Sequence, residues 1–332
     1  MTERVTIAVD GMGGDSAPQP VLAGIDLALA DDLDLAVIVT GPANVVEPFA
    51  ATRSDRVTAV PTSQVIEMGE HPATAVRSKR DSSIVVGATL VRDRRADGFF
   101  SAGSTGAVMA AATLVTGRIR GVQRPAIAAA LPTRRGPVVL LDVGANSDCK
   151  PEHLLQFAHM GAAYASIALG TREPRVALLN IGEEPTKGSQ LAIDAHELMK
   201  ADVPGFVGNL EARRLMDGDV DVVVTDGFTG NVALKLLEGS SAVLIGQIRQ
   251  AMTSSVWRKV LAAGLRPALA SVKDRMNPDV YGGAPLLGVA GVCIIGHGSS
   301  NEVAVRNGIA VAAKAARGHL DKAISERIQA AT

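Results

Sequence analysis

Cysteine, aromatic residues and net charge are all scarce in this sequence. Its 332 residues include only Cys149 and Cys293, so we expect neither a disulfide framework nor a cysteine-built metal cluster. Aromatic residues make up 3% and the formal net charge is −1, which argues against nucleic acid as a partner. No apolar run reaches the roughly 20 residues that span a bilayer, and no signal peptide precedes the first expected strand. We therefore expect a cytoplasmic protein.

Several motifs of common enzyme classes are also missing. There is no G-x-x-x-x-G-K-[ST] phosphate loop, no H-E-x-x-H or C-x-x-C metal motif and no G-x-S-x-G nucleophile elbow. The string that begins at Gly11 does not complete a dinucleotide fingerprint, because position 16 is serine. The sequence thus predicts no cofactor and no bound metal, and it lacks the usual signature of a covalent acyl-enzyme.

Apolar strands alternate with helices along the chain. Hydrophobic residues make up 47% and charged residues 20% of the sequence, which is enough apolar material for an extensive core. The expected strands are residues 4–9, 35–40, 57–60, 97–101, 126–131, 137–142, 174–180, 205–208, 220–225 and 290–296. The expected helices are residues 19–30, 73–93, 105–117, 151–169, 188–200, 229–252 and 301–328. This alternation predicts an α/β fold with a mostly parallel sheet and helices on both faces, with residues 1–332 forming one large unit or two closely joined lobes.

Polar, glycine-rich turns recur at the ends of the expected strands. The first, residues 10–15 (DGMGGD), directly follows the apolar run Val5-Thr6-Ile7-Ala8-Val9. Similar turns are residues 101–106, 142–146, 180–184, 226–231 and 296–300. Backbone N–H groups in such turns, and at the helix starts that follow them, are suited to bind phosphate. We therefore expect these turns to line one shared ligand crevice.

Lys187 and Asn231 are the candidate catalytic residues of these turns. Lys187 and Gly188 open an expected helix, where a positive charge opposes the helix dipole and so favours an anionic partner. Asn231 lies at the start of another helix, where it is either an ordinary cap or an amide donor to a developing oxyanion.

Other polar residues of the turns have equally local alternatives. Ser104 and Thr105 supply either a helix cap or a contact to an anion. Asp142 and Asp226 are expected to orient their loops rather than to take part in chemistry.

Residues 252–276 break the alternation of strands and helices. No strand is expected there, and Pro267 interrupts a helical pattern, so we expect a projecting hairpin of two helices that meet near this proline. Five basic residues and one acidic residue give the segment a local charge of +4. The arm either packs on a partner subunit or meets a membrane surface or an acidic partner, with Trp257, Leu261 and Leu265 as the expected membrane contacts.

Together these strings resemble the PlsX family of phosphate acyltransferases. The resemblance rests on residues 10–15, 101–107, 141–146 with 150–153, 182–184 with 187–188, 208–211, 224–231, and 281–283 with 297–300. It runs in order from about residue 4 to about residue 310. The sequence departs from the family pattern at Gly11, Ser16 and Ser104, where the family usually has alanine, histidine and asparagine.

The resemblance implies a fold, an activity and a set of site residues. The fold is a Rossmann-like α/β/α sandwich, similar to phosphate acetyltransferases and isopropylmalate-dehydrogenase-like folds, in a homodimer. The activity is transfer of a fatty acyl group from acyl carrier protein to inorganic phosphate, which gives acyl phosphate for phospholipid synthesis. Phosphate attacks directly, and Lys187 and Asn231 are expected to stabilise the oxyanion. The expected substrate-binding residues are Gly13, Gly14, Asp15, Ser104, Thr105, Gly106, Asp142, Asn146, Gly188, Asn209, Asp226, Thr229 and Gly230.

The resemblance also implies partners and a location. Acyl carrier protein is acidic, so Arg77, Lys79 and Arg80, or alternatively the basic arm of residues 258–275, are expected to dock it. The product is amphiphilic and passes to a membrane enzyme such as a membrane-bound glycerol-phosphate acyltransferase. We therefore expect a cytoplasmic protein that associates peripherally with the membrane through residues 252–276. Two alternatives remain: a phosphate acetyltransferase that uses a coenzyme A thioester, and a non-catalytic scaffold that recruits partners to the membrane.

Overall fold

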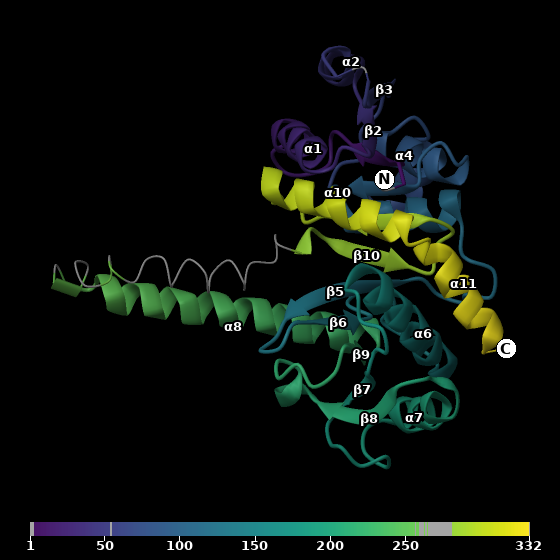
Figure 1. Cartoon of the computed structure of the whole chain (residues 1–332), viewed down its shortest axis with the longest axis vertical. Coiled ribbons are helices and arrows are strands. Elements are labelled where there is room, and N and C mark those ends of the chain that lie inside the picture. The colour runs from purple at the N-terminus through teal and green to yellow at the C-terminus, as the bar shows by residue number, and fades with distance from the viewer. Residues whose placement is uncertain are drawn as a thin grey trace.

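The computed structural model describes residues 3–53, 55–255, 257, 258, 262, 264 and 281–331 of the chain (Figure 1). The strands are β1 (Val5–Asp10), β2 (Leu35–Gly41), β3 (Val57–Pro61), β4 (Gly98–Ser101), β5 (Ala126–Pro132), β6 (Pro137–Leu141), β7 (Val176–Asn180), β8 (Phe206–Glu211), β9 (Val222–Val224), β10 (Ala284–Leu287) and β11 (Val292–Ile295). The helices are α1 (Gln19–Asp31), α2 (Ala43–Ala51), α3 (Pro72–Ser78), α4 (Ser83–Arg92), α5 (Thr105–Ala111), the π-helical η1 (Ala112–Thr116), α6 (Pro151–Ala168), α7 (Gln190–Asp202), the 3₁₀ turn η2 (Ala212–Arg214), α8 (Gly227–Thr253), α10 (Glu302–Arg317) and α11 (Leu320–Ala330).

One sheet of eleven strands runs through the molecule in the order β3-β2-β1-β4-β11-β10-β5-β6-β9-β7-β8. The first half, β3 to β11 in this order, is parallel, and so is the second half, β6 to β8. Between them, the pairings β11–β10, β10–β5 and β5–β6 are all antiparallel, so the two halves run in opposite directions. The predicted α/β fold with a mostly parallel sheet is confirmed, but the reversal at its centre was not predicted.

The predicted elements differ from the observed ones mainly at breaks inside helices. The helix expected over residues 73–93 is two helices, because the Ser82 hydroxyl accepts a hydrogen bond from the Val85 N–H and starts α4. The helix expected over residues 301–328 ends at Gly318 and resumes as α11 after His319, whose φ is +47°. Helix α2 and strand β10 were not expected, and each contains a proline.

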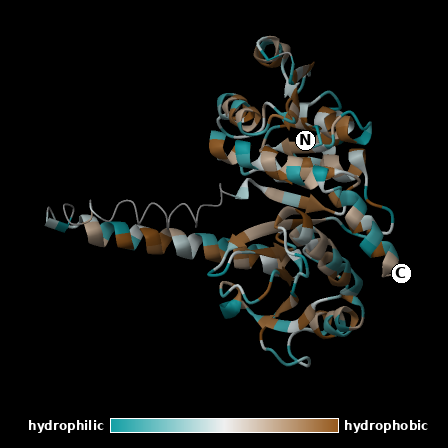
Figure 2. Ribbon diagram, viewed as in Figure 1, coloured by the Kyte–Doolittle hydropathy of each residue, from teal (hydrophilic) through white to brown (hydrophobic). Residues whose placement is uncertain are grey.

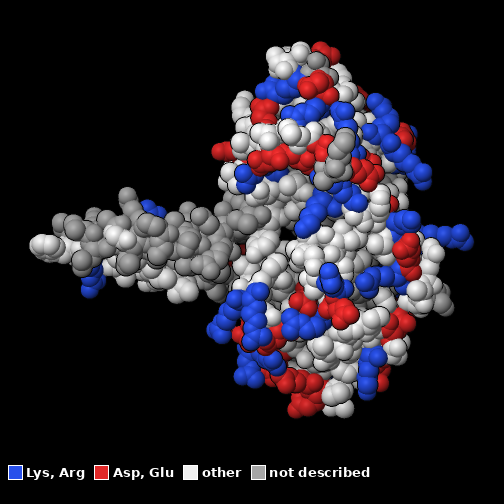
Figure 3. Space-filling view, viewed as in Figure 1, with Lys and Arg blue, Asp and Glu red and all other residues white. Residues whose placement is uncertain are grey.

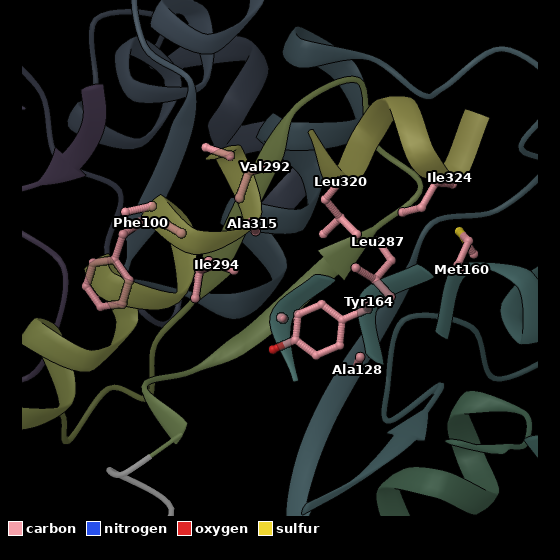
Figure 4. Packing of buried hydrophobic residues seen from close by; sticks show 14 of the residues in the cluster. Phe100, Ala128, Met160, Tyr164, Leu287, Val292, Ile294, Ala315, Leu320 and Ile324 are labelled. Carbon is pink, nitrogen blue, oxygen red and sulfur yellow. The ribbon is translucent and has the colours of Figure 1, made fainter. Parts of the chain in front are cut away.

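The strands are apolar on both sides because helices cover both faces of the sheet. Val139 on β6 packs in one hydrophobic cluster, and its neighbour Leu140 packs in the other. The first cluster lies under α1, α6, α10 and α11 and the second under α4 and α5. In Figure 4, Phe100 of β4 and Tyr164 of α6 belong to the same cluster, which therefore continues across the centre of the sheet from one half to the other.

Helix α8 leaves the body of the protein. It starts after β9 in the second half and extends outward over 27 residues (Figure 1). Hydrophobic residues recur along α8, as Figure 2 shows, and several of them are exposed in this chain. The exposed ones are Val232, Leu236, Val243, Leu244, Ile245 and Ile248. A helix with apolar residues on several sides is normally covered by a partner.

The hairpin predicted over residues 252–276 lies largely outside the described residues, which include only 252–255, 257, 258, 262 and 264 of it. Trp257 is described and is 79% exposed, whereas Leu261 and Leu265 are not described. None of the described helices combines the length and the hydropathy needed to cross a bilayer.

Candidate active site

Polar loops follow the strands of both halves, but they form two groups. The first-half loops (residues 10–15, 101–106 and 296–300) touch one another: the Asp15 N–H donates to the Gly298 carbonyl at 2.7 Å. The second-half loops (residues 142–146, 180–188 and 226–231) form a separate group. Among the described residues, no backbone hydrogen bond joins the two groups. The single crevice predicted from the sequence would therefore be lined by loops from two oppositely directed halves.

Asp142 organises the second-half loops. Its side chain is fully buried at the end of β6. One carboxylate oxygen accepts from the N–H groups of Ile127, Gly144 and Ala145 at 3.0–3.1 Å, and the other accepts from the N–H and the side-chain amide of Asn146 at 2.8 and 2.9 Å. Burial raises the pKa of Asp142, and these hydrogen bonds oppose that rise. Asp142 and Asn146 were both predicted to bind substrate, but in the structure their side-chain polar atoms form hydrogen bonds that hold the loop.

The start of α8 packs directly on this loop. Asp226 caps the helix by accepting from the Thr229 N–H at 2.9 Å, and the Gly227 N–H donates to the Asn146 carbonyl at 2.8 Å. Gly230 has no room for a side chain, since a β-carbon there would lie 1.9 Å from the Asp142 carbonyl oxygen. The close approach of α8 to the Asp142 loop is thus possible only with glycine at this position.

Asn231 is the next residue of α8, and its side-chain amide has no hydrogen-bond partner among the described residues. Its side-chain amide lies beside Gly144, where an added β-carbon would be 3.8 Å from the Asn231 amide carbon. The residue is exposed, and its amide makes no hydrogen bond with another described residue. Asn231 therefore presents an unoccupied donor at the end of β9.

Lys187 lies on the neighbouring loop, at the end of β7. Strand β7 pairs with β9, so the loop that carries Lys187 and the start of α8, which carries Asn231, follow adjacent strands at the same edge of the sheet. Helix α7 begins at Gln190 with Ser189 as its cap, so Lys187 precedes the helix instead of opening it as predicted. Its side chain is exposed, and its ammonium group has no hydrogen bond or ion pair with a described residue.

The first-half loops have a buried aspartate of their own. Asp10, at the end of β1, accepts from the Ser101 hydroxyl at 2.7 Å and from the Met12 N–H at 3.0 Å. Burial raises the pKa of this carboxyl. An added β-carbon at Gly13 would lie 2.8 Å from the Gly103 nitrogen, so the turns after β1 and β4 are in close contact. The Asp10 carboxylate thus holds the first-half loops by hydrogen bonds, as the Asp142 carboxylate holds the second-half loops.

The predicted substrate-binding residues of the first half differ in exposure. Ser104 precedes α5, but its hydroxyl does not cap the helix, so the capping alternative is not realised. Thr105 and Asp15 are exposed, while Gly14 and Gly106 are partly buried beside them. Thr105 and Asp15 therefore lie on the surface of the first-half loops, whereas Ser104 is buried.

The predicted docking residues differ in how they are used. Lys79 is partly buried, and its ammonium group contacts Glu70 at 2.5 Å and the Val65 carbonyl at 2.8 Å. Arg77 and Arg80 are exposed near the end of α3. Figure 3 shows basic and acidic residues interspersed over both halves of the visible face, so charge on this face does not mark one docking region.

Sequence reasoning did not assign roles to Asn180 or His196. Asn180 is the last residue of β7, and its side chain donates to the Lys187 carbonyl at 2.9 Å. His196 lies buried in α7, and its Nδ1 is 3.0 Å from the side-chain oxygen of Asn209. A polar residue at the end of a strand before a glycine turn was the available signal for Asn180. Nothing in the sequence marked His196.

Comparison with known proteins bears on this site. Residues 5–322 match a family model described as "Fatty acid synthesis protein". A phosphate acyltransferase of Heliobacterium modesticaldum is 47% identical over 326 residues, covering 97% of each chain. A phosphate acyltransferase of Desulfitobacterium hafniense is 48% identical over 309 residues, covering 92% of each chain. A phosphotransacetylase from Streptococcus pyogenes is similar in fold, with a TM-score of 0.63 at 16% identity over 94% of each chain.

Proposed function

The chain belongs to this family of phosphate acyltransferases, and from that membership we propose that it transfers a fatty acyl group from acyl carrier protein to inorganic phosphate. The enzyme is an acyltransferase whose substrates are phosphate and an acyl donor. The finer assignment concerns the donor, the product and the mechanism. The donor is a long-chain thioester of acyl carrier protein, and the product is acyl phosphate for phospholipid synthesis.

One observation carries the assignment of the reacting residues. In the second-half loops, Asp142, Asn146 and Asp226 use their polar atoms to hold the backbone, whereas Lys187 and Asn231 leave theirs unoccupied. A cation and an amide donor at the ends of adjacent strands are what a tetrahedral oxyanion requires. The Lys187 loop and the start of α8, which carries Asn231, both have backbones held by other residues, which favours a preorganised site.

The reaction needs no nucleophile from the protein. An oxygen of hydrogen phosphate attacks the thioester carbonyl carbon, and the carbonyl electrons move onto the oxygen that Lys187 and Asn231 stabilise. The oxyanion then collapses, the carbon–sulfur bond breaks, and the departing thiolate takes the proton that the phosphate loses. The products are acyl phosphate and the free thiol of the carrier protein, and much of the acceleration comes from holding both reactants in register.

The twist of the sheet supports a role for the first-half loops in the same site. Five steps in the strand order separate β4 from β9, so the accumulated twist is about 100–125°. Oppositely directed strands then open their loops at an angle of roughly 55–80° instead of back to back. We place the phosphate and the donor between the two groups, with Gly13, Gly14 and residues 104–106 on the first-half side.

The purified protein is expected to release carrier-protein thiol from a long-chain acyl donor only when phosphate is present. The reaction should run without nucleotide or added metal and should reverse when acyl phosphate and free carrier protein are supplied. Thiol release followed with a chromogenic reagent, together with detection of acyl phosphate, checks this. Release that persists without phosphate would identify a thioesterase and overturn the proposal.

The same assay separates the two possible donors. A coenzyme A enzyme needs a nucleotide site, whereas a carrier-protein enzyme needs an exposed basic surface. Arg77 and Arg80 are the exposed basic residues of the predicted docking segment, and Lys79 is held by Glu70. Faster turnover of acetyl coenzyme A than of a long-chain acyl carrier protein would favour a phosphate acetyltransferase.

The homodimer and the membrane contact are part of the same proposal. Val232, Leu236 and Val243, spaced by four and seven residues, share one stripe of α8 and are each more than half exposed. This stripe fits a second copy of the helix. Trp257, beyond the end of α8, is the described residue that fits a membrane surface, where a cytoplasmic enzyme would pass its amphiphilic product to a membrane-bound glycerol-phosphate acyltransferase.

Dimerisation and membrane binding are expected to respond to different substitutions. The pair Leu236→Glu and Val243→Glu buries charge in the proposed interface and should convert the dimer to monomers in analytical ultracentrifugation. Trp257→Glu should leave the dimer intact and lower the fraction that sediments with vesicles of phosphatidylglycerol and phosphatidylethanolamine. Arg249→Glu is the control for charge, because it also changes the net charge by −2 but lies on another side of α8. A paired variant that stays dimeric would contradict the assigned interface, and unchanged vesicle binding of Trp257→Glu would contradict the membrane contact.

A further inference from the structure

We propose that Asn180, together with the pair Asn209–His196, positions the Lys187 loop for catalysis. The inference rests on the proposed role of Lys187 and concerns residues that do not touch the reactants. Residues 181–189 contain no regular secondary structure, and all but Gly182 are exposed. A loop of this kind would present a lysine in many orientations, so what holds it determines where the ammonium group lies.

Asn180 holds both ends of the loop. Its side-chain oxygen accepts from the Ile181 N–H at 2.8 Å, where the loop begins. Its side-chain nitrogen donates to the Lys187 carbonyl at 2.9 Å, where the loop closes. The amide therefore bridges the first residue of the loop and the backbone of the proposed catalytic residue.

The Asn180 side chain also leaves no room for a side chain at position 188. The φ of Gly188 is +97°, and a β-carbon there would lie 2.3 Å from the Asn180 side-chain oxygen. The space next to Lys187 is thus filled by the Asn180 amide. This contact is enough to require glycine at position 188, which was predicted to bind substrate.

The middle of the loop is held from the other side by Asn209. Its side-chain nitrogen donates to the Glu184 carbonyl at 2.8 Å, and its oxygen lies 3.0 Å from Nδ1 of His196. Because that oxygen is an acceptor, His196 donates from Nδ1, which fixes the orientation of the Asn209 amide. His196 is buried and packs edge-on against Phe206, with the ring centroids 5.2 Å apart.

Arg214 holds the side chain of Glu183 in this loop. It contacts the Glu183 carboxylate at 2.6 Å and the Asp219 carboxylate at 3.1 Å. In the part of the loop between Asn180 and Ser189 that the structure describes, Glu183 has an ion pair, whereas the Glu184 carboxylate and the Lys187 ammonium group have none. The hydrogen bonds of Asn180 and Asn209 therefore hold the backbone of the loop, while the Lys187 ammonium group remains exposed.

The test is a double-mutant cycle between Asn180 and Lys187. Asn180→Ala is expected to lower kcat by up to about a hundredfold, since displacement of a catalytic group by about 1 Å has that effect. The KM for the carrier-protein donor should change little. In a Lys187→Ala background, Asn180→Ala should lower kcat by no more than about twofold, because the group that it positions is gone.

A second variant keeps the test independent of how Asn180→Ala folds. Asn209→Ala should show the same loss in kcat and the same lack of effect in the Lys187→Ala background. Asn44→Ala, at an exposed asparagine of α2, is the matched control and should leave kcat unchanged. Thermal melting of each variant confirms that the comparison is made on folded protein.

The possible outcomes separate this inference from the proposed function. Full turnover of both asparagine variants, or losses that multiply with that of Lys187→Ala, would overturn the positioning role. Near-normal turnover of Lys187→Ala itself would instead overturn the proposed function of that lysine.

Discussion

Lys187→Ala is expected to lower turnover by about 10²–10³-fold, the usual effect of removing one donor to an oxyanion. The ammonium group is exposed and has no partner among the described residues, so its removal should leave the fold intact. The loss should appear in kcat, because the interaction forms as negative charge develops on the carbonyl oxygen. Phosphate-dependent thiol release from acyl carrier protein measures it.

The matched control for this substitution is Lys200→Ala. Lys200 is also exposed and lies in the last turn of α7, the helix that follows the Lys187 loop. Its replacement changes the net charge equally and should leave turnover unchanged. Asn231→Ala is expected to show a loss of the same order as Lys187→Ala, and near-normal turnover in either site variant would remove that residue from the mechanism.

Gly230→Ala is expected to destabilise the protein by about 3 kcal/mol, at the upper end of the usual cost of overpacking. The new methyl group would meet the Asp142 carbonyl oxygen at 1.9 Å and its carbon at 3.0 Å. Both are backbone atoms, so neither can rotate away. Asp142 is held in place by the hydrogen bonds that its carboxylate accepts from backbone N–H groups. The start of α8 would therefore have to move instead. Denaturant unfolding followed by circular dichroism measures the change in the free energy of unfolding.

Gly239→Ala provides the comparison within the same helix. No described atom lies within 4 Å of a β-carbon at Gly239, and alanine in a helix interior is more favourable than glycine by about 0.5–1 kcal/mol. This variant should therefore be equally or more stable than the parent. If Gly230→Ala unfolded at the same denaturant concentration as the parent, the close packing of α8 on the Asp142 loop would be wrong.

The sequence predicted the α/β class and most strands because those strands are long apolar runs. It missed β10 since Ala284–Leu287 is short, contains Pro285 and follows two glycines, which are features of a turn. Yet β10 is one of the strands that reverse the direction of the sheet. Direction depends on which strands pair across the molecule, and no local pattern of residues carries that information.

For the candidate site, the recurring turns pointed to polar residues that follow the strands, such as Asp142 and Asn231. The sequence does not distinguish a polar side chain that holds its own backbone from one that is free. Asn146 and Asn209 looked like substrate contacts, but the structure uses their amides within the loops. Only the three-dimensional arrangement of donors and acceptors separates the two uses.

Helix α8 joins the candidate site to the periphery of the molecule as one stiff rod. Asn231 lies in its first turns, and the helix continues without a break to Thr253. At 1.5 Å per residue the rod is about 40 Å long, so a rotation of about 5° at its base corresponds to a displacement of about 3.5 Å at its far end. The same geometry applies in the opposite direction. A partner or surface that fixed the far end of α8 would restrain the angle of the helix at its base, and so would restrain the position of the Asn231 amide beside the loop of Asp142.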